Sequence, residues 1–295
     1  MLRVGTIVTR PVLLKERLVE TLRVDALTDQ DERDVQAFLS LRPVHTVYMA
    51  GLIRDNGLVS PLNRGQFYSY RNPAGQLEGV ALVGPKMVFE TRSRAALEAF
   101  ARLALENPAR ELIRGDEEQI ERLSDFLSRR GLAPRLVCRE LLLEQLSTVE
   151  GVQAVPDLRH ARLEELDQVA SINATMLSEE QGMNTLERDP QGALQRLRRR
   201  IEQGRVWVLI ERGRIIFKAD VISETPHAAF IEGVYVHPQE RGRGCGFRCM
   251  TQLGRNLLAH VGALCLVVNE ENRAAQALYK KVGYRLRSRY CTIYF

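Results

Sequence analysis

The sequence predicts an α/β (α+β) protein built from two domains in tandem. A chain of 295 residues exceeds a typical domain of about 100 to 200 residues and is long enough for two cores. Both halves alternate β-prone apolar runs with stretches of helical periodicity, which is typical of sheets covered by helices. In the second half, one apolar strand leads directly into a glycine-rich loop and a helix. We expect domains at residues 1–150 and 156–295, joined near residues 151–156, where the periodicity is lost.

The first half alternates strands and helices but has no Gly-x-Gly loop at the equivalent place. A hairpin is expected around the turn Asn72-Pro73-Ala74-Gly75, because these residue types favour turns between apolar runs. The acidic residues after Asp116 favour the start of a helix. We expect strands at residues 22–26, 67–71, 79–83, 111–114 and 136–143, and helices at residues 28–41, 93–105 and 116–129.

The second half follows a single α/β unit. Asp189-Pro190 is a helix-start signal, and the helix after it is strongly basic. A hairpin is expected around the turn at residues 211–214. The predicted strands are residues 158–163, 206–210, 215–221, 230–236, 263–268 and 288–295, with helices after residue 164, after Pro190, after the glycine loop and after Asn272.

The loop after residues 230–236 has the composition of an anion site. Glycine stands at 242, 244 and 246, and arginine at 241, 243 and 248. Backbone N–H groups, a helix dipole and fixed positive charge together bind phosphate at such loops. A dinucleotide fingerprint would need glycine at Phe247, and a nucleoside-triphosphate loop would need Gly-Lys-Ser/Thr at residues 247–249. Neither pattern is present, so the phosphate belongs to another kind of ligand.

Two motifs resemble the GNAT superfamily of acyl-CoA-dependent N-acetyltransferases. Residues 239–244, Gln-Glu-Arg-Gly-Arg-Gly, match the family's Gln/Arg-x-x-Gly-x-Gly/Ala signature. Residues 272–284 match its closing Asn-x-x-Ala-x-x-Leu-Tyr helix followed by Gly-Phe/Tyr. The resemblance implies a mixed, mostly antiparallel twisted sheet flanked by helices. The first half is then either a degenerate GNAT-like repeat without a CoA loop or an unrelated α/β domain.

The resemblance also implies a cofactor site. Acetyl-CoA, or another acyl-CoA, would be the co-substrate, with its pyrophosphate on the loop amides. A backbone N–H at a splayed point of the preceding strand would polarise the thioester carbonyl. The cofactor-binding residues implied in this way are Val234, Tyr235, Val236, Arg241, Gly242, Arg243, Gly244, Cys245, Gly246, Asn269 and Asn272. The basic helix with Arg196, Arg198, Arg199 and Arg200 is either a solvated face or one wall of the acceptor cleft.

Two residues are candidates for proton chemistry. Tyr279 stands where many GNAT enzymes place the phenol that protonates the departing thiolate; a core tyrosine is the alternative. Glu232 has even spacing with Val234 and Val236, so all three are expected to face the same way. Burial there would raise the pKa of Glu232 and make it a base. Pairing with an arginine and binding of the acceptor's ammonium are its other possible roles.

The function expected is transfer of acetyl from acetyl-CoA to a primary amine of a small molecule, by direct attack in a ternary complex. Enzymes that acetylate protein N-termini carry a catalytic glutamate in the strand before the Asn-x-x-Ala helix, and the aligned residue here is Val267. This disfavours, without excluding, a protein amine as acceptor. A non-catalytic acyl-CoA-binding regulatory module is the other alternative.

The charge distribution and the cysteine content limit which ligands and which cellular compartment are expected. Lys plus Arg against Asp plus Glu number 21 and 21 in residues 1–155, and 21 and 16 in residues 156–295, so the excess of five lies in the second half. The arginines around the loop indicate CoA phosphates rather than nucleic acid. Five cysteines without a Cys-x-x-Cys pair indicate a reduced, cytoplasmic protein with no metal site. No apolar run approaches the roughly 18 to 20 residues of a membrane span.

Overall fold

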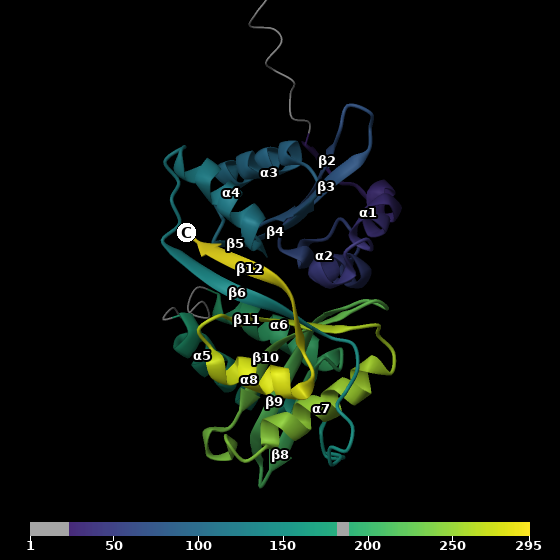
Figure 1. The fold of residues 1–295 in the computed structure, drawn as a ribbon, viewed down its shortest axis with the longest axis vertical. Coiled ribbons are helices and arrows are strands. Elements are labelled where there is room, and N and C mark those ends of the chain that lie inside the picture. Colours follow the sequence, from purple (N-terminus) through teal and green to yellow (C-terminus); the bar gives the residue numbers. More distant parts are fainter. Residues whose placement is uncertain (1–23, 182–188) are drawn as a thin grey trace, which may run out of the picture.

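The computed structural model describes residues 24–181 and 189–295, which form one structure with two halves (Figure 1). In these ranges the strands build a single sheet of 12, in the order β1-β2-β3-β4-β5-β12-β6-β11-β10-β9-β8-β7. Most neighbours pair antiparallel, while β4–β5 and β10–β11 are parallel. No helix in the described part of the chain is long and apolar enough to cross a membrane.

The N-terminal half contains six strands, four helices and two short 3-10 turns within the described residues. The strands are β1 (Val24–Ala26), β2 (Gln66–Arg71), β3 (Leu77–Val83), β4 (Lys86–Thr91), β5 (Leu112–Asp116) and β6 (Leu136–Gln145). The helices are α1 (Glu32–Leu39), α2 (Pro43–Asn56), α3 (Arg94–Glu106) and α4 (Glu117–Ser128). The predicted hairpin is confirmed as β2–β3, with Gly75 at φ 81° in its turn.

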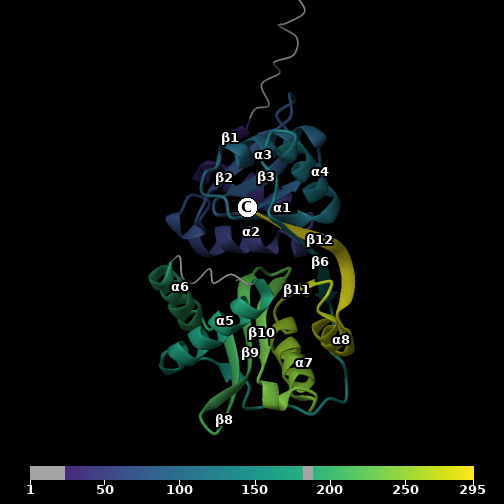
Figure 2. The ribbon, with the colours of Figure 1, turned by 90° about the vertical axis from the view of Figure 1, so that its left-hand side faces the viewer.

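The C-terminal half repeats this order of elements. Its strands are β7 (Arg159–His160), β8 (Val206–Glu211), β9 (Arg214–Glu224), β10 (Ala229–Val236), β11 (Leu264–Asn269) and β12 (Arg285–Tyr294). Its helices are α5 (Leu166–Gln181), α6 (Pro190–Glu202), α7 (Cys245–Leu258) and α8 (Arg273–Val282). Figure 2 shows α5 and α6 on one face of β8–β10 and α7 and α8 on the other.

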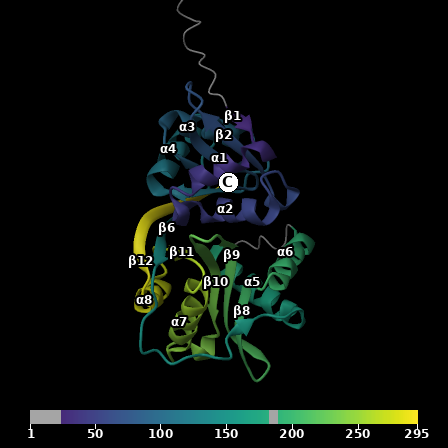
Figure 3. The ribbon, with the colours of Figure 1, turned by 90° about the vertical axis from the view of Figure 1, so that its right-hand side faces the viewer.

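The two halves exchange their last strands. β12, from the C-terminal half, pairs antiparallel with β5 of the N-terminal half, from Tyr290–Asp116 to Tyr294–Leu112. β6, from the N-terminal half, pairs antiparallel with β11 of the C-terminal half, from Leu264–Gln145 to Asn269–Glu140. The two exchanged strands also pair with each other, and Figures 1 and 3 show them side by side along the connection between the halves. The sheet is therefore continuous through both halves.

Helix α2 is a second connection between the halves. It contacts β4 of its own half and β9 and β10 of the other half, and it lies between them in Figure 2. Ser223 Oγ on β9 donates to the carbonyl of Val47 at 2.7 Å. A Cβ at Gly51 would meet that Ser223 oxygen at 1.9 Å, so glycine is what permits the close approach. Arg205 pairs with Asp55 at the end of α2.

The strand expected at residues 158–163 is limited to Arg159–His160, because the chain turns into a 3-10 helix at Leu163–Glu165, where the Glu165 carboxylate accepts the Arg162 N–H at 2.7 Å. The helix start at Asp189 is confirmed, since its carboxylate accepts the Gly192 N–H at 2.9 Å. Residues 22 and 23 of the first predicted strand lie outside the described residues.

Candidate active site

Strand β10 is irregular at its centre. Glu232 pairs with Asp220 of β9 and Tyr235 pairs with Lys218, so one extra residue is inserted into β10 between them. Gly233 occupies this bulge with φ 61°, a backbone conformation that favours glycine. On its other edge, β10 pairs with β11 only at Ala229–Leu264 and Phe230–Cys265. The two parallel strands therefore splay apart beyond Phe230.

The bulge changes which face of the sheet three side chains lie on, compared with the expectation from the sequence. Val234 and Val236 pack against the core on the α7 side of the sheet. Glu232 instead reaches Arg114, on the opposite side, where α2 lies. The expectation that all three share a face is wrong, because an inserted residue breaks the two-residue alternation of a strand.

A buried lysine holds the bulge. Lys218 on β9 has a side-chain exposure of 0%, and its Nζ donates to the carbonyl oxygen of Gly233 at 3.2 Å. Its charge is paired with Asp220 at 3.0 Å, and Asp220 also accepts from Arg200 of α6 at 3.2 Å. A Cβ at residue 233 would meet Lys218 Nζ at 2.7 Å. The bulge, the lysine and its counter-ion thus form one packed unit, and burial lowers the pKa of Lys218.

The glycine loop lies between β10 and α7. Gly242 and Gly244 have φ values of 74° and 79°, which glycine adopts without strain. Gly244 is the N-cap of α7 and brings no side chain to the amides of the first turn, which leaves them available to an anion. A Cβ at Gly246 would meet Val236 Cγ2 at 2.9 Å. The helix therefore starts in direct contact with the end of the splayed strand.

The arginines of the loop differ in what they contact. Arg241 Nε donates to the carbonyl of Val236 at 3.0 Å and ties the loop to the strand. The Arg243 side chain is 71% exposed and lies 3.6 Å from Glu240. Arg248 is exposed beside them, with Nη1 3.5 Å from the Arg243 carbonyl. Free amides and exposed guanidinium groups fit the pyrophosphate of an acyl-CoA.

Cys245 is a predicted loop residue with a different setting. Its side chain is buried in the first turn of α7, with its sulfur 4.0 Å from that of Cys249. Its backbone N–H is thus the group it can offer to a phosphate. Among the described residues, no group of three His, Cys, Asp or Glu side chains could hold a metal ion.

Glu232 belongs to a network that spans both halves. Arg114 on β5 donates to Glu232 at 3.3 Å, to Glu140 of β6 at 3.1 Å and to Thr292 of β12 at 2.8 Å. Burial by itself raises the pKa of Glu232, but the positive charges of Lys86, Arg114 and Arg200 outweigh it, so the pKa lies below its usual value. This is the opposite of the raised pKa expected from the sequence. The 35% exposed carboxylate is an ionised, paired group.

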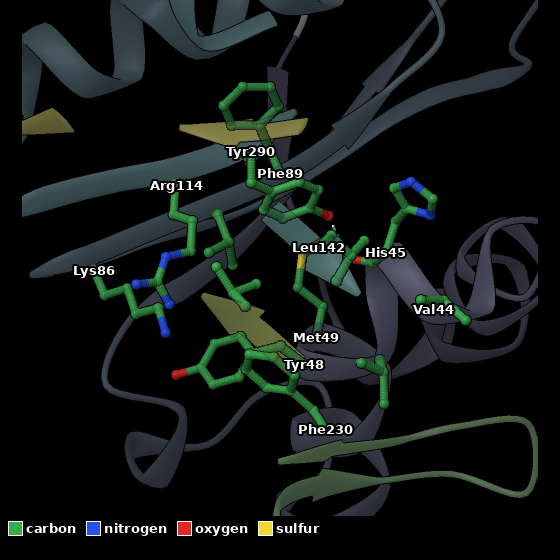
Figure 4. A pocket seen from close by; sticks show the side chains of 14 residues that line it. Val44, His45, Tyr48, Met49, Lys86, Phe89, Arg114, Leu142, Phe230 and Tyr290 are labelled. Carbon is green, nitrogen blue, oxygen red and sulfur yellow. Dashed lines mark hydrogen bonds between the residues drawn. The ribbon is translucent and has the colours of Figure 1, made fainter. Parts of the chain in front are cut away.

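A cavity of about 50 Å³ lies beside this network, between α2 and the exchanged strands. Figure 4 shows Lys86 and Arg114 reaching it from one side, with Tyr48 and Phe230 below them. The Lys86 ammonium lies 4.2 Å from the centre of the Tyr48 ring. Val267, the position aligned with the glutamate of N-terminal acetyltransferases, is part of the apolar lining. The cavity thus combines aromatic and aliphatic surface with two cations.

Residues of the closing motif occupy the α7 side. Tyr279 is 8% exposed, belongs to the core cluster of this half and packs its ring against Tyr284, 5.8 Å between centroids. Asn272 is the N-cap of α8, accepting the Ala275 N–H at 3.0 Å. Asn269 ends β11 and accepts the Glu271 N–H at 2.7 Å. These bonds account for both asparagines as helix and turn residues, and their contact with CoA stays a prediction.

Four residues near the site were not predicted from the sequence: Lys86, Arg114, Glu140 and Lys218. The sequence contains one indication of Lys218, because a lysine is unusual inside an apolar run such as residues 215–221. The other three lie on strands of the N-terminal half, where no motif marks them. Strand pairing between the halves brings them to the site.

Comparisons with known proteins agree with the fold. Residues 202–286 match the family model of the acetyltransferase (GNAT) domain. A search of curated protein sequences found no match. The chain resembles a GNAT-family acetyltransferase from Colwellia psychrerythraea at 13% identity and TM-score 0.57, over 92% of this chain and 99% of that one.

Two further solved structures match over similar lengths. A Drosophila protein has 13% identity and TM-score 0.65, over 92% of this chain and 98% of that one. A tandem GNAT protein from the clavulanic acid biosynthesis pathway has 14% identity and TM-score 0.54, over 92% and 97%. Identities this low report the fold. Residues 202–286 are therefore a GNAT acetyltransferase domain, and the chain as a whole has the fold of tandem GNAT proteins.

Proposed function

We propose that this chain is an acyl-CoA-dependent N-acyltransferase that transfers acetyl from acetyl-CoA to a primary amine of a small molecule. The observation that carries the proposal is one contact: Gly246, in the first turn of α7, lies against Val236, at the end of the splayed strand. A phosphate site and an opening in the sheet are thereby adjacent. A pyrophosphate on the loop amides leaves a thioester within reach of the bulge in β10.

The chemistry forms one C–N bond and breaks one C–S bond. Bound acetyl-CoA supplies the activated acyl group. The neutral amine of the acceptor attacks the carbonyl carbon, and backbone N–H groups at residues 234–236 stabilise the negative charge on the carbonyl oxygen. The Tyr279 hydroxyl donates a proton to the leaving thiolate. Attack in a ternary complex requires no covalent enzyme intermediate.

Glu232 acts on the acceptor rather than as a strong base. With its pKa lowered by the surrounding cations, its carboxylate is ionised at neutral pH and binds an ammonium by charge-assisted hydrogen bonds. The proton that the ammonium must lose passes to Glu232 or to water. Nearby Lys86, Arg114 and Arg200 favour this loss, because positive neighbours lower the pKa of an ammonium group.

The acceptor side of the site favours a small molecule. Helix α2 covers the sheet there, and the cavity beneath it, about 50 Å³, is lined from both halves. A peptide would need an open groove. Acetylation of peptides but not of small amines would instead indicate that the acceptor is a protein amine.

The cofactor half of the proposal is tested by Gly244→Ala. Alanine in this left-handed conformation costs about 1 to 2 kcal/mol, so the free loop relaxes and binding must restore it. We expect acetyl-CoA affinity, measured by calorimetry, to fall by about tenfold. Gly75→Ala is the matched control, a glycine of φ 81° with open space around it in the β2–β3 turn. Equal affinity in both variants, or no binding by the unmodified protein, would contradict a CoA site at the loop.

A further inference from the structure

We propose that the acceptor is a zwitterionic amine whose ammonium pairs with Glu232 and whose anionic group pairs with Lys86 of the N-terminal half. The inference rests on the proposed function and names the substrate class of the same site. It gives the half without a CoA loop a direct part in selecting the acceptor.

Lys86 is a cation at the wall of the cavity, where a ligand can reach it. It lines the cavity from β4, and its ammonium rests on the Tyr48 ring at 4.2 Å. Among the described residues, no carboxylate lies within ion-pair distance of it. Arg114, the neighbouring cation, already donates to Glu232, Glu140 and Thr292. A second anion entering the cavity therefore meets Lys86.

The charges around the site are balanced. Next to Glu232 lie the cations Lys86, Arg114, Arg200 and Lys218 and the carboxylates Glu140 and Asp220. Arg42, with its partners Glu90 and Asp116, lies beside the cavity residues His45 and Tyr290. Together these are five cations and five carboxylates. A zwitterion keeps this balance, whereas an acceptor with only an ammonium adds one positive charge.

The lining defines the body of the acceptor. The cavity lining includes Tyr48, Phe230, Val267 and Leu142, which present aromatic and aliphatic surface beside Lys86 and Arg114. With about 50 Å³ of space, this surface fits a small apolar substituent. An amino acid or similar amphoteric amine with a short apolar side chain has all three features.

The test compares acceptors that differ in one group. Leucine, leucinamide and 3-methylbutylamine share an apolar body and an amine, but only leucine carries a carboxylate. Leucinamide has the less basic amine of the first two, so a preference for leucine does not arise from easier deprotonation. We expect kcat/KM for leucine to exceed that for leucinamide by about tenfold or more, the size of one charge-assisted contact.

Variants of Lys86 test whether this residue causes the preference for leucine over leucinamide. Lys86→Met keeps an unbranched stem on Tyr48 and removes the charge. A change in deprotonation affects leucine and leucinamide alike, so the expected result is that the ratio of their kcat/KM values falls to about one. Lys86→Arg should restore the advantage, and Lys280→Met, on the exposed side of α8, is the control for loss of one positive charge. Equal use of the three amines, or an equal loss for leucine and leucinamide in Lys86→Met, would overturn the inference and leave the proposed function standing. If no amine releases CoA, the proposed function itself fails.

Discussion

At the scale of single residues, the site depends on a lysine that cannot touch either substrate. Lys218 is fully buried and donates to the Gly233 carbonyl, and so it fixes the bulge at the point where β10 and β11 separate. Its counter-ion Asp220 keeps a second partner, Arg200, when Lys218 is removed. This arrangement separates the role of Lys218 in positioning the backbone from a role in general stability.

Lys218→Met is expected to lower kcat by about 10- to 100-fold, because misaligned oxyanion donors cost rates of that order. The affinity for desulfo-CoA, which binds mainly through the loop, should change by less than about twofold. Removing one ion of a buried pair is destabilising, but Asp220 keeps Arg200 as a partner, so we expect the variant to fold with reduced stability, checked by circular dichroism. Steady-state kinetics and calorimetry on the same preparation check this; an unchanged kcat, or parallel losses in both quantities, would remove the positioning role.

The residues of the site divide by how their position is determined. Gly242, Gly244 and Tyr279 are candidates from the sequence alone, because a local motif marks them. Lys86 and Arg114 could not, because only pairing between distant strands places them beside Glu232. The direction of the Glu232 pKa depends on those same cations, which is why burial alone gave the wrong expectation.

At the scale of elements, α2 is the helix that the sequence hides. Its buried residues, Val44, Thr46, Val47, Met49, Ala50, Gly51 and Ile53, lie around most of its circumference. A helix buried between two layers lacks the one-sided apolar stripe by which helices are recognised. The helix α6, by contrast, starts at a capping signal, Asp189-Pro190, and could be predicted.

His45 on α2 makes the packing between the halves sensitive to pH. Its side chain is 6% exposed, with Nε2 3.3 Å from Ser288 Oγ on β12. Burial, then the positive charge of Arg42, lowers its pKa from 6.5 to about 4. Between pH 6.5 and pH 4, His45 is protonated in the unfolded chain but neutral in the folded protein, so the free energy of unfolding falls as the pH is lowered. Below pH 4 it is protonated in both states, and the contribution of His45 no longer changes with pH.

This histidine is expected to account for about 3 kcal/mol of stability lost between those pH values, at 1.36 kcal/mol per pKa unit. His45→Gln keeps a polar partner for Ser288 and removes the titration. Urea unfolding at pH 6.5 and 4 should therefore show a smaller loss for this variant than for the unmodified protein. His260→Gln, at an exposed position, controls for loss of a histidine. The same pH dependence in His45→Gln and the unmodified protein would contradict a buried, neutral His45.

At the scale of the whole molecule, the exchanged strands join the two halves into one sheet. The alternation of strands and helices predicted two structural units. Local periodicity does not reveal which strands pair when they lie far apart in the sequence. Residues 156–295 contain β12 but lack β6, the strand that covers β11. An isolated second half would expose the edge of a strand with buried Leu264, Cys265 and Leu266.

We expect the chain to unfold as one cooperative unit. Trp207, the only tryptophan, lies on β8 and reports the C-terminal half by fluorescence, while far-ultraviolet circular dichroism reports both halves. Their urea transitions should coincide, which is the signature of two-state behaviour. A fragment of residues 156–295 should not show the transition of the full chain. Two separated transitions, or a stable fragment, would mean that the halves fold independently.

The central claim is that this fold transfers an acetyl group, and it is tested most directly by amine-dependent release of free thiol from acetyl-CoA. The account predicts release with at least one small amine, loss of most of that rate in Tyr279→Phe, and unchanged acetyl-CoA binding in the same variant. Binding of acetyl-CoA with no thiol release for any small amine or peptide would contradict it and indicate a module that binds the cofactor without using it.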